Sequence, residues 1–282
     1  MNIGRFEIES LSEGIFEVFE DGSLHKVQAE QITSPPPELI VPKKSALVGI
    51  DPILIRDGKH NILIDCGLGW GLDARSSYEN TSNLKTNLDI FGLSPSDITH
   101  VVLSHLHFDH AGGASFVDTN AETQPTLPFA NYFVQKKEWH YALECVHSEN
   151  STPGAGYELD EFYKLIALDK IALLTDAQFE LIPGVTLIRT GGHTPGHQIV
   201  KIQDGDDVGY YLGDLVPAED HLNQYTMRQL DADPLEAKKA KTLILRQAYR
   251  ENACLLFYHS IHAKAGRLSL DVDRRYVLEE IS

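Results

Sequence analysis

The sequence predicts an α/β protein with layered sheets, folded as a single domain over residues 1–282. Segments with the alternation and turn residues of strands are interspersed with segments of helical character. Three of the expected strands are apolar at nearly every position, which is typical of strands with both faces buried. Because no linker-like stretch separates the two halves of the chain, we expect one domain.

Two hairpins are predicted from Asp-Gly pairs that interrupt strand-like runs. Asp57-Gly58 lies within the first, at residues 53–65, and Asp204-Gly205 lies within the second, at residues 198–212. Asp and Gly tolerate the positive φ that a two-residue turn demands.

Helices and buried strands account for much of the remaining chain. Gly92 is a typical stop for the first helix, whereas Asp233 is a typical cap and Pro234 a typical first residue for the last. The predicted helices span residues 83–91, 136–147, 158–167 and 234–249. The strands expected to be buried on both faces span residues 99–104, 185–189 and 254–258. Residues 28–44, with three consecutive prolines, are predicted to form a stiff extended connection.

The acidic composition excludes several classes of partner. The net charge of −17 argues against nucleic acid, which requires a basic surface. No apolar run reaches the roughly 18 residues that a membrane helix needs, and the first residues do not resemble a signal peptide. We therefore expect a cytoplasmic protein that acts on a small neutral substrate. The free cysteines Cys66, Cys145 and Cys254 are expected to be buried thiols, because they are few and widely spaced.

The segment that indicates the chemistry is THVVLSHLHFDHAGG, at residues 99–113. Its apolar strand is followed at once by His105, His107, Asp109 and His110. Residues i and i+2 of an extended chain point to the same side, so His105 and His107 should converge, while Asp109 and His110 can serve a second point. Imidazole nitrogen and carboxylate oxygen are ligand types that suit zinc. Gly112-Gly113 permits tight backbone just after these ligands.

Four further motifs lie along the chain: ILIDCG at 62–67, GGHTPGH at 191–197, YLGD at 211–214 and FYH at 257–259. With the segment at 99–113, they make the chain similar to the metallo-β-lactamase superfamily of metallohydrolases over nearly its whole length. The resemblance implies a four-layer αββα metallo-β-lactamase sandwich. It also implies that Asp65 supports the ligand loop from behind. His197 is expected to pack or hydrogen-bond behind that loop.

The resemblance implies two Zn²⁺ ions and seven ligands, which are His105, His107, Asp109, His110, His193, Asp214 and His259. By the same resemblance, one ion is held by His105, His107 and His193, and the other by Asp109, His110 and His259. Asp214 and a hydroxide would bridge the pair. Seven side chains are too many for one tetrahedral ion and suit two.

The final ligand has a competitor in His262. Residues 254–257 are uniformly apolar, and functional residues in layered α/β proteins lie where such strands end. His259 occupies that place, whereas His262 lies three residues further on, roughly 10 Å along an extended chain. We therefore expect His259 to be the ligand.

Within the superfamily, the chain most resembles the quorum-quenching N-acyl homoserine lactonase group. This resemblance rests on DPILI at 51–55, HLHFDH at 105–110, GDLVP at 213–217 and LFYH at 256–259. It implies that the bridging hydroxide opens a neutral lactone or ester and that Asp109 passes a proton to the leaving group. It also allows a homodimer. The lactonases carry a Tyr that hydrogen-bonds the substrate carbonyl where this chain has Pro217; His221 or Tyr225, in the loop beyond, could replace it.

Two other activities occur on the same fold. A hydrolase of organophosphates or aryl esters is nearly as close in resemblance. Iron-dependent oxidoreductases are more distant, because the diiron members place a Glu where His107 stands and the persulfide dioxygenases use a single iron. The complete set of seven ligands here favours a hydrolase with two metal ions.

Overall fold

The computed structural model describes residues 1–19, 24–27, 45–74, 84–147, 156–159, 162–223, 225–228 and 230–281. The connection predicted at residues 28–44 lies outside these ranges. Among the helices in the described ranges, none is both long and apolar enough to cross a membrane.

Two seven-stranded sheets form the centre of the molecule. The first has the order β1 (Asn2–Ile3), β2 (Phe6–Ser10), β6 (Ile53–Arg56), β7 (Asn61–Ile64), β8 (His100–Val102), β11 (Asn131–Gln135), β12 (Ile171–Leu174). The second has the order β13 (Gln178–Ile182), β14 (Val185–Arg189), β15 (Gln198–Asp204), β16 (Asp207–Tyr211), β17 (Cys254–Leu256), β18 (Ala265–Leu270), β19 (Tyr276–Glu280). Strands β7, β8, β11 and β12 pair in parallel, as do β16 and β17, and the other neighbours in the two sheets are antiparallel.

Smaller elements surround these sheets. A three-stranded sheet has the order β4 (Leu24–Lys26), β3 (Gly14–Phe19), β5 (Ser45–Ile50), and β9 (Ser115–Val117) pairs with β10 (Thr123–Pro125). The α-helices are α2 (Leu84–Ile90), α3 (Phe108–Ala111), α4 (Lys136–His147), α5 (Phe162–Ala167) and α6 (Pro234–Arg250). Short 3-10 helices span Pro95–Asp97, Gly112–Ala114, Gly213–Leu215 and Glu219–His221.

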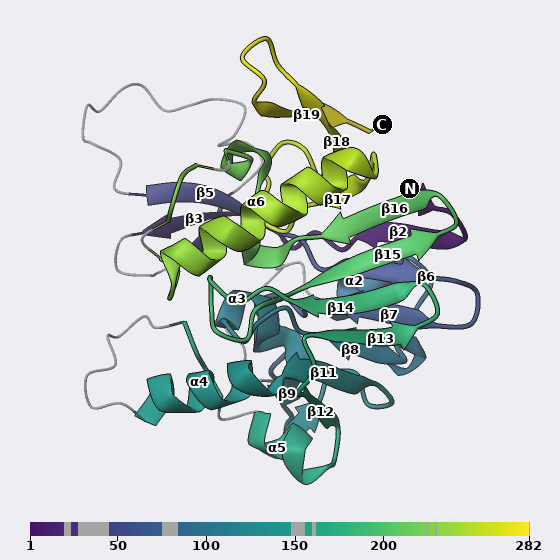
Figure 1. The fold of residues 1–282 in the computed structure, drawn as a ribbon. Coiled ribbons are helices and arrows are strands. Elements are labelled where there is room, and N and C mark those ends of the chain that lie inside the picture. The colour runs from purple at the N-terminus through teal and green to yellow at the C-terminus, as the bar shows by residue number, and fades with distance from the viewer. Residues whose placement is uncertain are drawn as a thin grey trace.

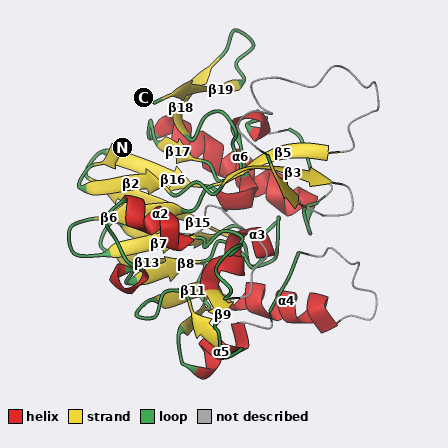
Figure 2. Ribbon diagram, turned by 180° about the vertical axis from the view of Figure 1, so that it is seen from behind, coloured by secondary structure: helices red, strands yellow, loops and turns green. Residues whose placement is uncertain are grey.

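Three buried apolar clusters show the predicted four-layer αββα arrangement. One cluster lies between the two large sheets and contains Ile55 and Ile64 from the first sheet and Leu187 and Val200 from the second. A second cluster joins the outer face of the first sheet to α2, α4 and α5. A third joins the outer face of the second sheet to α6. Figure 1 shows α6 across the second sheet, and Figure 2 shows α2 on the opposite side of the molecule.

Strand β6 shows why the predicted runs are apolar at successive positions. Ile53 and Ile55 belong to the cluster between the sheets, whereas Leu54 belongs to the cluster beneath the helices. Side chains alternate between the two faces of a strand, so a strand covered on both faces needs an apolar residue at every position. The same holds for β17, where Leu255 and Leu256 belong to different clusters.

Both predicted hairpins form, but each turn is displaced by one residue. Arg56 pairs with Asn61 and the Asp57 backbone N–H donates to His60, so Gly58 and Lys59 are the central turn residues. Asp204 likewise pairs with Asp207 across Gly205 and Asp206. Both glycines have positive φ, as the first central position of such a turn favours.

The helix predicted at residues 158–167 begins too early. The structure gives α5 only from Phe162, and residues 156–159 are not helical. The Gly156 carbonyl accepts from the Phe108 N–H at 2.6 Å, and Tyr157 forms a β-bridge with His107. These two contacts tie residues 156 and 157 to the segment at 107–108, ahead of the start of α5 at Phe162.

The other predicted helices are confirmed within a residue or two of their expected ends. The Asp233 side chain caps α6 by accepting from the backbone N–H groups of Leu235 and Glu236, at 3.0 and 2.9 Å. Cys66 and Cys254 are buried as expected, whereas Cys145 is only half-buried.

Glu13 is a buried carboxyl group that should make stability depend on pH. Its side chain is almost fully buried, and its Oε2 accepts from the Leu68 N–H at 3.0 Å. Burial raises the pKa of Glu13 from 4.5 to about 8. Between these two pH values the folded state keeps a proton on Glu13 that the unfolded state releases. The contribution of the Glu13 side chain to stability is therefore complete below about pH 4.5 and is lost as the pH rises to about 8.

We expect Glu13→Gln, which resembles the protonated acid, to remove this pH dependence. The unfolding free energy of the variant, relative to the parent, should increase between about pH 5 and 8, by an amount on the order of 1–3 kcal/mol. Urea unfolding at several pH values measures it. Glu180→Gln, at an exposed position of β13, is the control; equal behaviour of the two variants would show that burial of Glu13 is not the cause.

Candidate metal centre

The segment at residues 104–110 brings its polar side chains together because it leaves a buried strand and turns at once into a helix. β8 ends at Val102, and α3 begins at Phe108. Gly112 and Gly113 then pass close to neighbouring backbone, as predicted: a Cβ on Gly113 would lie 2.0 Å from the Cys66 carbonyl oxygen. This close approach ties the segment to the end of β7.

The first group of converging side chains consists of His105, His107 and His193. Nε2 of His105 lies 2.9 Å from Nδ1 of His107, which lies 3.2 Å from Nε2 of His193. His105 is fully buried and His193 is 4% exposed, so little water reaches these nitrogens. One potential ligand atom from each of the three side chains lies within 4.8 Å of the others.

The second group consists of Asp109, His110 and His259, and it also lies within 4.8 Å. Nε2 of His110 is 3.1 Å from Nε2 of His259, and Oδ2 of Asp109 is 3.5 Å from the latter atom. Asp214 stands between the two groups. Its Oδ1 is 3.3 Å from Nε2 of His110 and 3.2 Å from Nε2 of His259, and its Oδ2 is 3.3 Å from Nε2 of His193. All seven predicted ligands therefore meet in one place.

Hydrogen bonds at the far side of several rings fix which nitrogen faces the centre. Nδ1 of His110 lies 2.8 Å from Asp65 Oδ2, Nδ1 of His193 lies 3.0 Å from Asp231 Oδ1, and Nδ1 of His259 lies 2.8 Å from the Gly49 carbonyl. For His110 and His259 the acceptor requires the proton on Nδ1, which leaves the lone pair of Nε2 directed inwards. Nδ1 of His193 also lies 2.9 Å from Nη2 of Arg228. His107 differs, because its Nδ1 faces the centre.

This donor set fits metal cations. Burial and the neighbouring imidazoles hold the pKa of His105 and of His107 well below the usual range, so both rings are neutral, as a ligand must be. Oδ1 of Asp214 is buried and accepts no hydrogen bond from the described residues. Nitrogens that face one another at about hydrogen-bond distance, around an unsatisfied carboxylate oxygen, are the partners a cation would need.

Asp65 lies behind the cluster, as expected. Its fully buried carboxylate accepts from the backbone N–H and the hydroxyl of Ser104, both at 2.7 Å, and from the Tyr211 hydroxyl at 2.5 Å. With the bond from His110, four donors converge on this one side chain. Its φ of 58° is unusual for a residue other than glycine.

His197 also lies behind the cluster rather than in it. Its Nε2 accepts from the Asp214 backbone N–H at 3.0 Å, and its Nδ1 lies 2.7 Å from the Thr190 hydroxyl. Both ring nitrogens are thus engaged, and the ring fixes the backbone that presents Asp214.

The structure separates the two histidines near the end of β17. His259 lies in the cluster, and its backbone N–H donates to the Pro217 carbonyl at 2.9 Å. His262 is exposed and belongs to none of the three potential ligand groups found in the described part of the chain.

The two residues considered as replacements for the missing tyrosine do not reach the cluster. Tyr225 is 70% exposed. His221 instead lines a neighbouring hollow with Arg228. No described contact joins either side chain to a predicted ligand.

Sequence reasoning missed Glu138, a fully buried carboxylate. It links the loop that carries His105 and His107 to the loop that carries His193. It accepts from the Leu106 N–H at 3.0 Å on one loop and from the Thr194 hydroxyl at 2.5 Å on the other. The Tyr157 hydroxyl also donates to it, at 3.1 Å. Burial raises the pKa of Glu138, and these hydrogen bonds oppose the rise. Nothing in the sequence around residue 138 marks this role, because its partners come from distant segments.

Asp231 and Arg228 were missed as well. Asp231 accepts from His193, and Arg228 donates to Asp231 Oδ1 at 2.8 Å and to the Asp214 carbonyl at 2.5 Å. The loop after Asp214 therefore returns to hold two of the predicted ligands.

We expect Asp231→Ala to weaken metal binding by roughly ten- to a hundredfold, because it frees the His193 ring and leaves the Arg228 charge unpaired beside it. Competition with a chromophoric chelator measures the change. Asp233→Ala is the control, since it removes the α6 cap and should cost about 1 kcal/mol of stability without altering metal affinity. Equal metal affinity of the two variants would refute this role for Asp231.

Comparison with known proteins decides the family. The family model of the metallo-beta-lactamase superfamily matches residues 47–248, well over half of the chain. The chain belongs to the metallo-β-lactamase superfamily. Members of this superfamily typically bind two metal ions, and the described residues include candidate groups for both.

Curated relatives of this superfamily member include lactonases. An N-acyl homoserine lactonase from a Bacillus species is 27% identical over 180 residues, which are 62% of this chain and 61% of the relative. Another, from Bacillus cereus, is 33% identical over 118 residues, which are 42% of this chain and 38% of the relative. The chain thus spans less than two thirds of the length of these relatives.

Solved structures of the superfamily share the fold over the whole chain. A probable metal-dependent hydrolase from Staphylococcus aureus is 25% identical with a TM-score of 0.74, and the match covers all of both chains. AidC, a dizinc quorum-quenching lactonase solved with a product, is 22% identical with a TM-score of 0.72, covering 100% of this chain and 97% of that chain. At this identity the likeness to AidC shows the fold alone.

Proposed function

We propose that the protein is a metal-dependent hydrolase that binds two zinc ions and opens a neutral lactone or ester, as N-acyl homoserine lactonases do. Membership of the superfamily and the lactonase relatives indicate a metal-dependent hydrolase. The single observation that carries the proposal is the convergence of seven imidazole and carboxylate side chains on one buried point, in two groups with Asp214 between them.

The metal ions would be held by the two groups of side chains already described. His105, His107 and His193 would hold one ion, Asp109, His110 and His259 the other, and Asp214 would contribute one carboxylate oxygen to each. When bound, two zinc ions supply a water of lowered pKa and positive charge for a developing oxyanion. The chain's own contribution is to keep the imidazoles of His105 and His107 neutral and to fix the orientation of the rings through hydrogen bonds.

Asp109 is suited to moving a proton during the reaction. Its side chain is 22% exposed, so it can reach both the predicted metal site and a bound substrate. The Tyr258 hydroxyl donates to the Asp109 carbonyl at 2.5 Å and fixes the backbone that carries the carboxylate. We propose that Asp109 accepts the proton that the attacking oxygen loses and delivers it to the oxygen that leaves the carbonyl carbon.

A neutral substrate agrees with the acidic chain, whose net charge is −17. The small neutral substrate, the cytoplasmic location, the single domain and the homodimer stay predictions, as does the expectation that neither nucleic acid nor a membrane is a partner. An organophosphate or aryl-ester substrate is the second candidate, and an iron-dependent oxidoreductase is the more distant alternative.

The experiment is a hydrolysis panel at fixed enzyme and zinc concentrations. It contains acyl homoserine lactones, γ-lactones, paraoxon-type triesters, glutathione thioesters and β-lactams. We expect the largest kcat/KM among the lactones or simple esters. Turnover of triesters or thioesters well above every lactone and ester would overturn the lactonase proposal while leaving the hydrolase proposal in place.

A further inference from the structure

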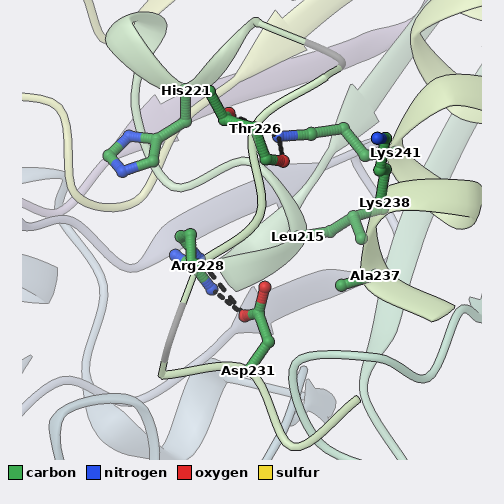
Figure 3. Close-up of a pocket in the computed structure, with 8 residues that line it drawn as sticks. All are labelled: Leu215, His221, Thr226, Arg228, Asp231, Ala237, Lys238 and Lys241. Carbon is green, nitrogen blue, oxygen red and sulfur yellow. Dashed lines mark hydrogen bonds and ion pairs between the residues drawn. The ribbon is translucent and has the colours of Figure 1, made fainter. Parts of the chain in front are cut away.

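A small, positively charged hollow lies beside the cluster of predicted ligands, between helix α6 and the described residues of the chain between Leu215 and Asp231. Figure 3 shows its lining residues, which are Leu215, His221, Thr226, Arg228, Asp231, Ala237, Lys238 and Lys241. The hollow is narrow and partly open to solvent, so only a small group fits between these side chains.

Positive charge exceeds negative charge around this hollow. It is lined by three cations, Arg228, Lys238 and Lys241, and by one carboxylate, Asp231. Asp231 already pairs with Arg228 and His193. No carboxylate in the described part of the chain forms an ion pair with Lys238 or Lys241. In a chain with a net charge of −17, such a concentration of unpaired positive charge is unexpected.

Lys241 is the most informative of these cations, because its side chain is only 5% exposed. Its Nζ donates to the carbonyl and the hydroxyl of Thr226, at 3.2 and 3.3 Å, and Figure 3 shows these groups facing one another at the edge of the hollow. Both acceptors are neutral, and the carboxylate of Asp231, whose charge Lys241 also feels, is already paired with Arg228 and His193. Burial and the nearby Arg228 lower the pKa of Lys241. A buried charge is costly unless a counter-charge accompanies it.

We propose that the hollow binds a small oxyanion, a carboxylate or a phosphate, held by Lys241, Lys238 and Arg228. The oxyanion would add negative charge where three cations share the single carboxylate of Asp231. The planar guanidinium group of Arg and the ammonium group of Lys both donate hydrogen bonds to carboxylate and phosphate oxygens.

Arg228 connects this hollow to the metal cluster. Its Nη2 donates to the Asp214 carbonyl, and its Nη1 lies 3.8 Å from Asp214 Oδ2. Hydrolysis of a lactone or ester converts a neutral substrate into a carboxylate, so the product of the proposed reaction is one source of the oxyanion. The product as the source of the oxyanion rests on the proposed function. Binding of a free anion such as inorganic phosphate would not depend on that function.

The first test measures inorganic phosphate binding to the zinc-loaded protein by calorimetry. Compared with the parent, Lys238→Met and the double variant Lys238→Met/Lys241→Met should bind phosphate about tenfold more weakly or worse. Lys239→Met removes one positive charge at an exposed position of the same helix and is the matched control. It should change phosphate affinity by about twofold or less. Metal content and melting temperature verify that each variant is folded and loaded.

Phosphate affinity that is unchanged in both hollow variants would overturn the proposal, because the anion would then bind elsewhere, for example at the metals. An equal loss in Lys239→Met would also overturn it, since net charge alone would be responsible. Inhibition by the reaction product distinguishes the sources: weakening by the same factor in the hollow variants identifies the product carboxylate, and unchanged product inhibition identifies a free anion. The phosphate result does not depend on activity, so it stands even if the panel finds no lactone turnover.

Discussion

Replacing Asp214 by Ala is expected to lower kcat/KM by about a thousandfold or more while leaving the fold intact. The side chain lies within 3.3 Å of nitrogens from both groups of predicted ligands, so its loss affects both metal positions at once. The fold should survive because His197 and Arg228 hold the backbone of residue 214 rather than its carboxylate.

Circular dichroism, melting temperature and steady-state kinetics on the best substrate of the panel measure this effect. Asp220→Ala is the control, since that side chain is 78% exposed in the loop beyond Asp214. It should keep nearly full activity. An Asp214→Ala protein that keeps a tenth of the parent activity, or that fails to fold, would contradict the role proposed for this carboxylate.

Replacing His259 by Ala is expected to remove one of two bound metal ions, whereas His262→Ala should keep both. The His259 ring is held by the Gly49 carbonyl and turns Nε2 towards Asp109 and Asp214. His262 is exposed, three residues further along. Metal analysis of both variants after gel filtration decides between them. The opposite pattern, with an ion lost only from His262→Ala, would reverse the assignment.

Much of the fold could be predicted from sequence, because a strand that is buried on both faces has apolar residues at successive positions. The unbroken apolar runs at β8 and β17 reflect two covered faces. The position of the turns was less predictable, because it depends on local side-chain bonds. The start of α5 was less predictable because residues 156 and 157 contact residues 107 and 108, which are distant in sequence. The Asp57 side chain accepts from the backbone N–H groups of Lys59 and His60, at 3.0 and 2.7 Å, and moves the turn by one residue.

Part of the candidate site could likewise be predicted from sequence, and part could not. Its histidines and aspartates occur in short motifs that resemble those of the superfamily, so the resemblance named all seven before the structure brought them together. Glu138 and Asp231 could not be found in this way. Each acts through partners that are distant in sequence, and a single acidic residue at a helix start or in a loop has no distinguishing pattern.

The dinuclear site itself is tested most directly by elemental analysis of the purified protein together with its activity. Two zinc-class ions per chain are predicted, with activity lost on chelation and recovered when the second ion is restored. At most one metal ion per chain at full activity would contradict the two-metal account.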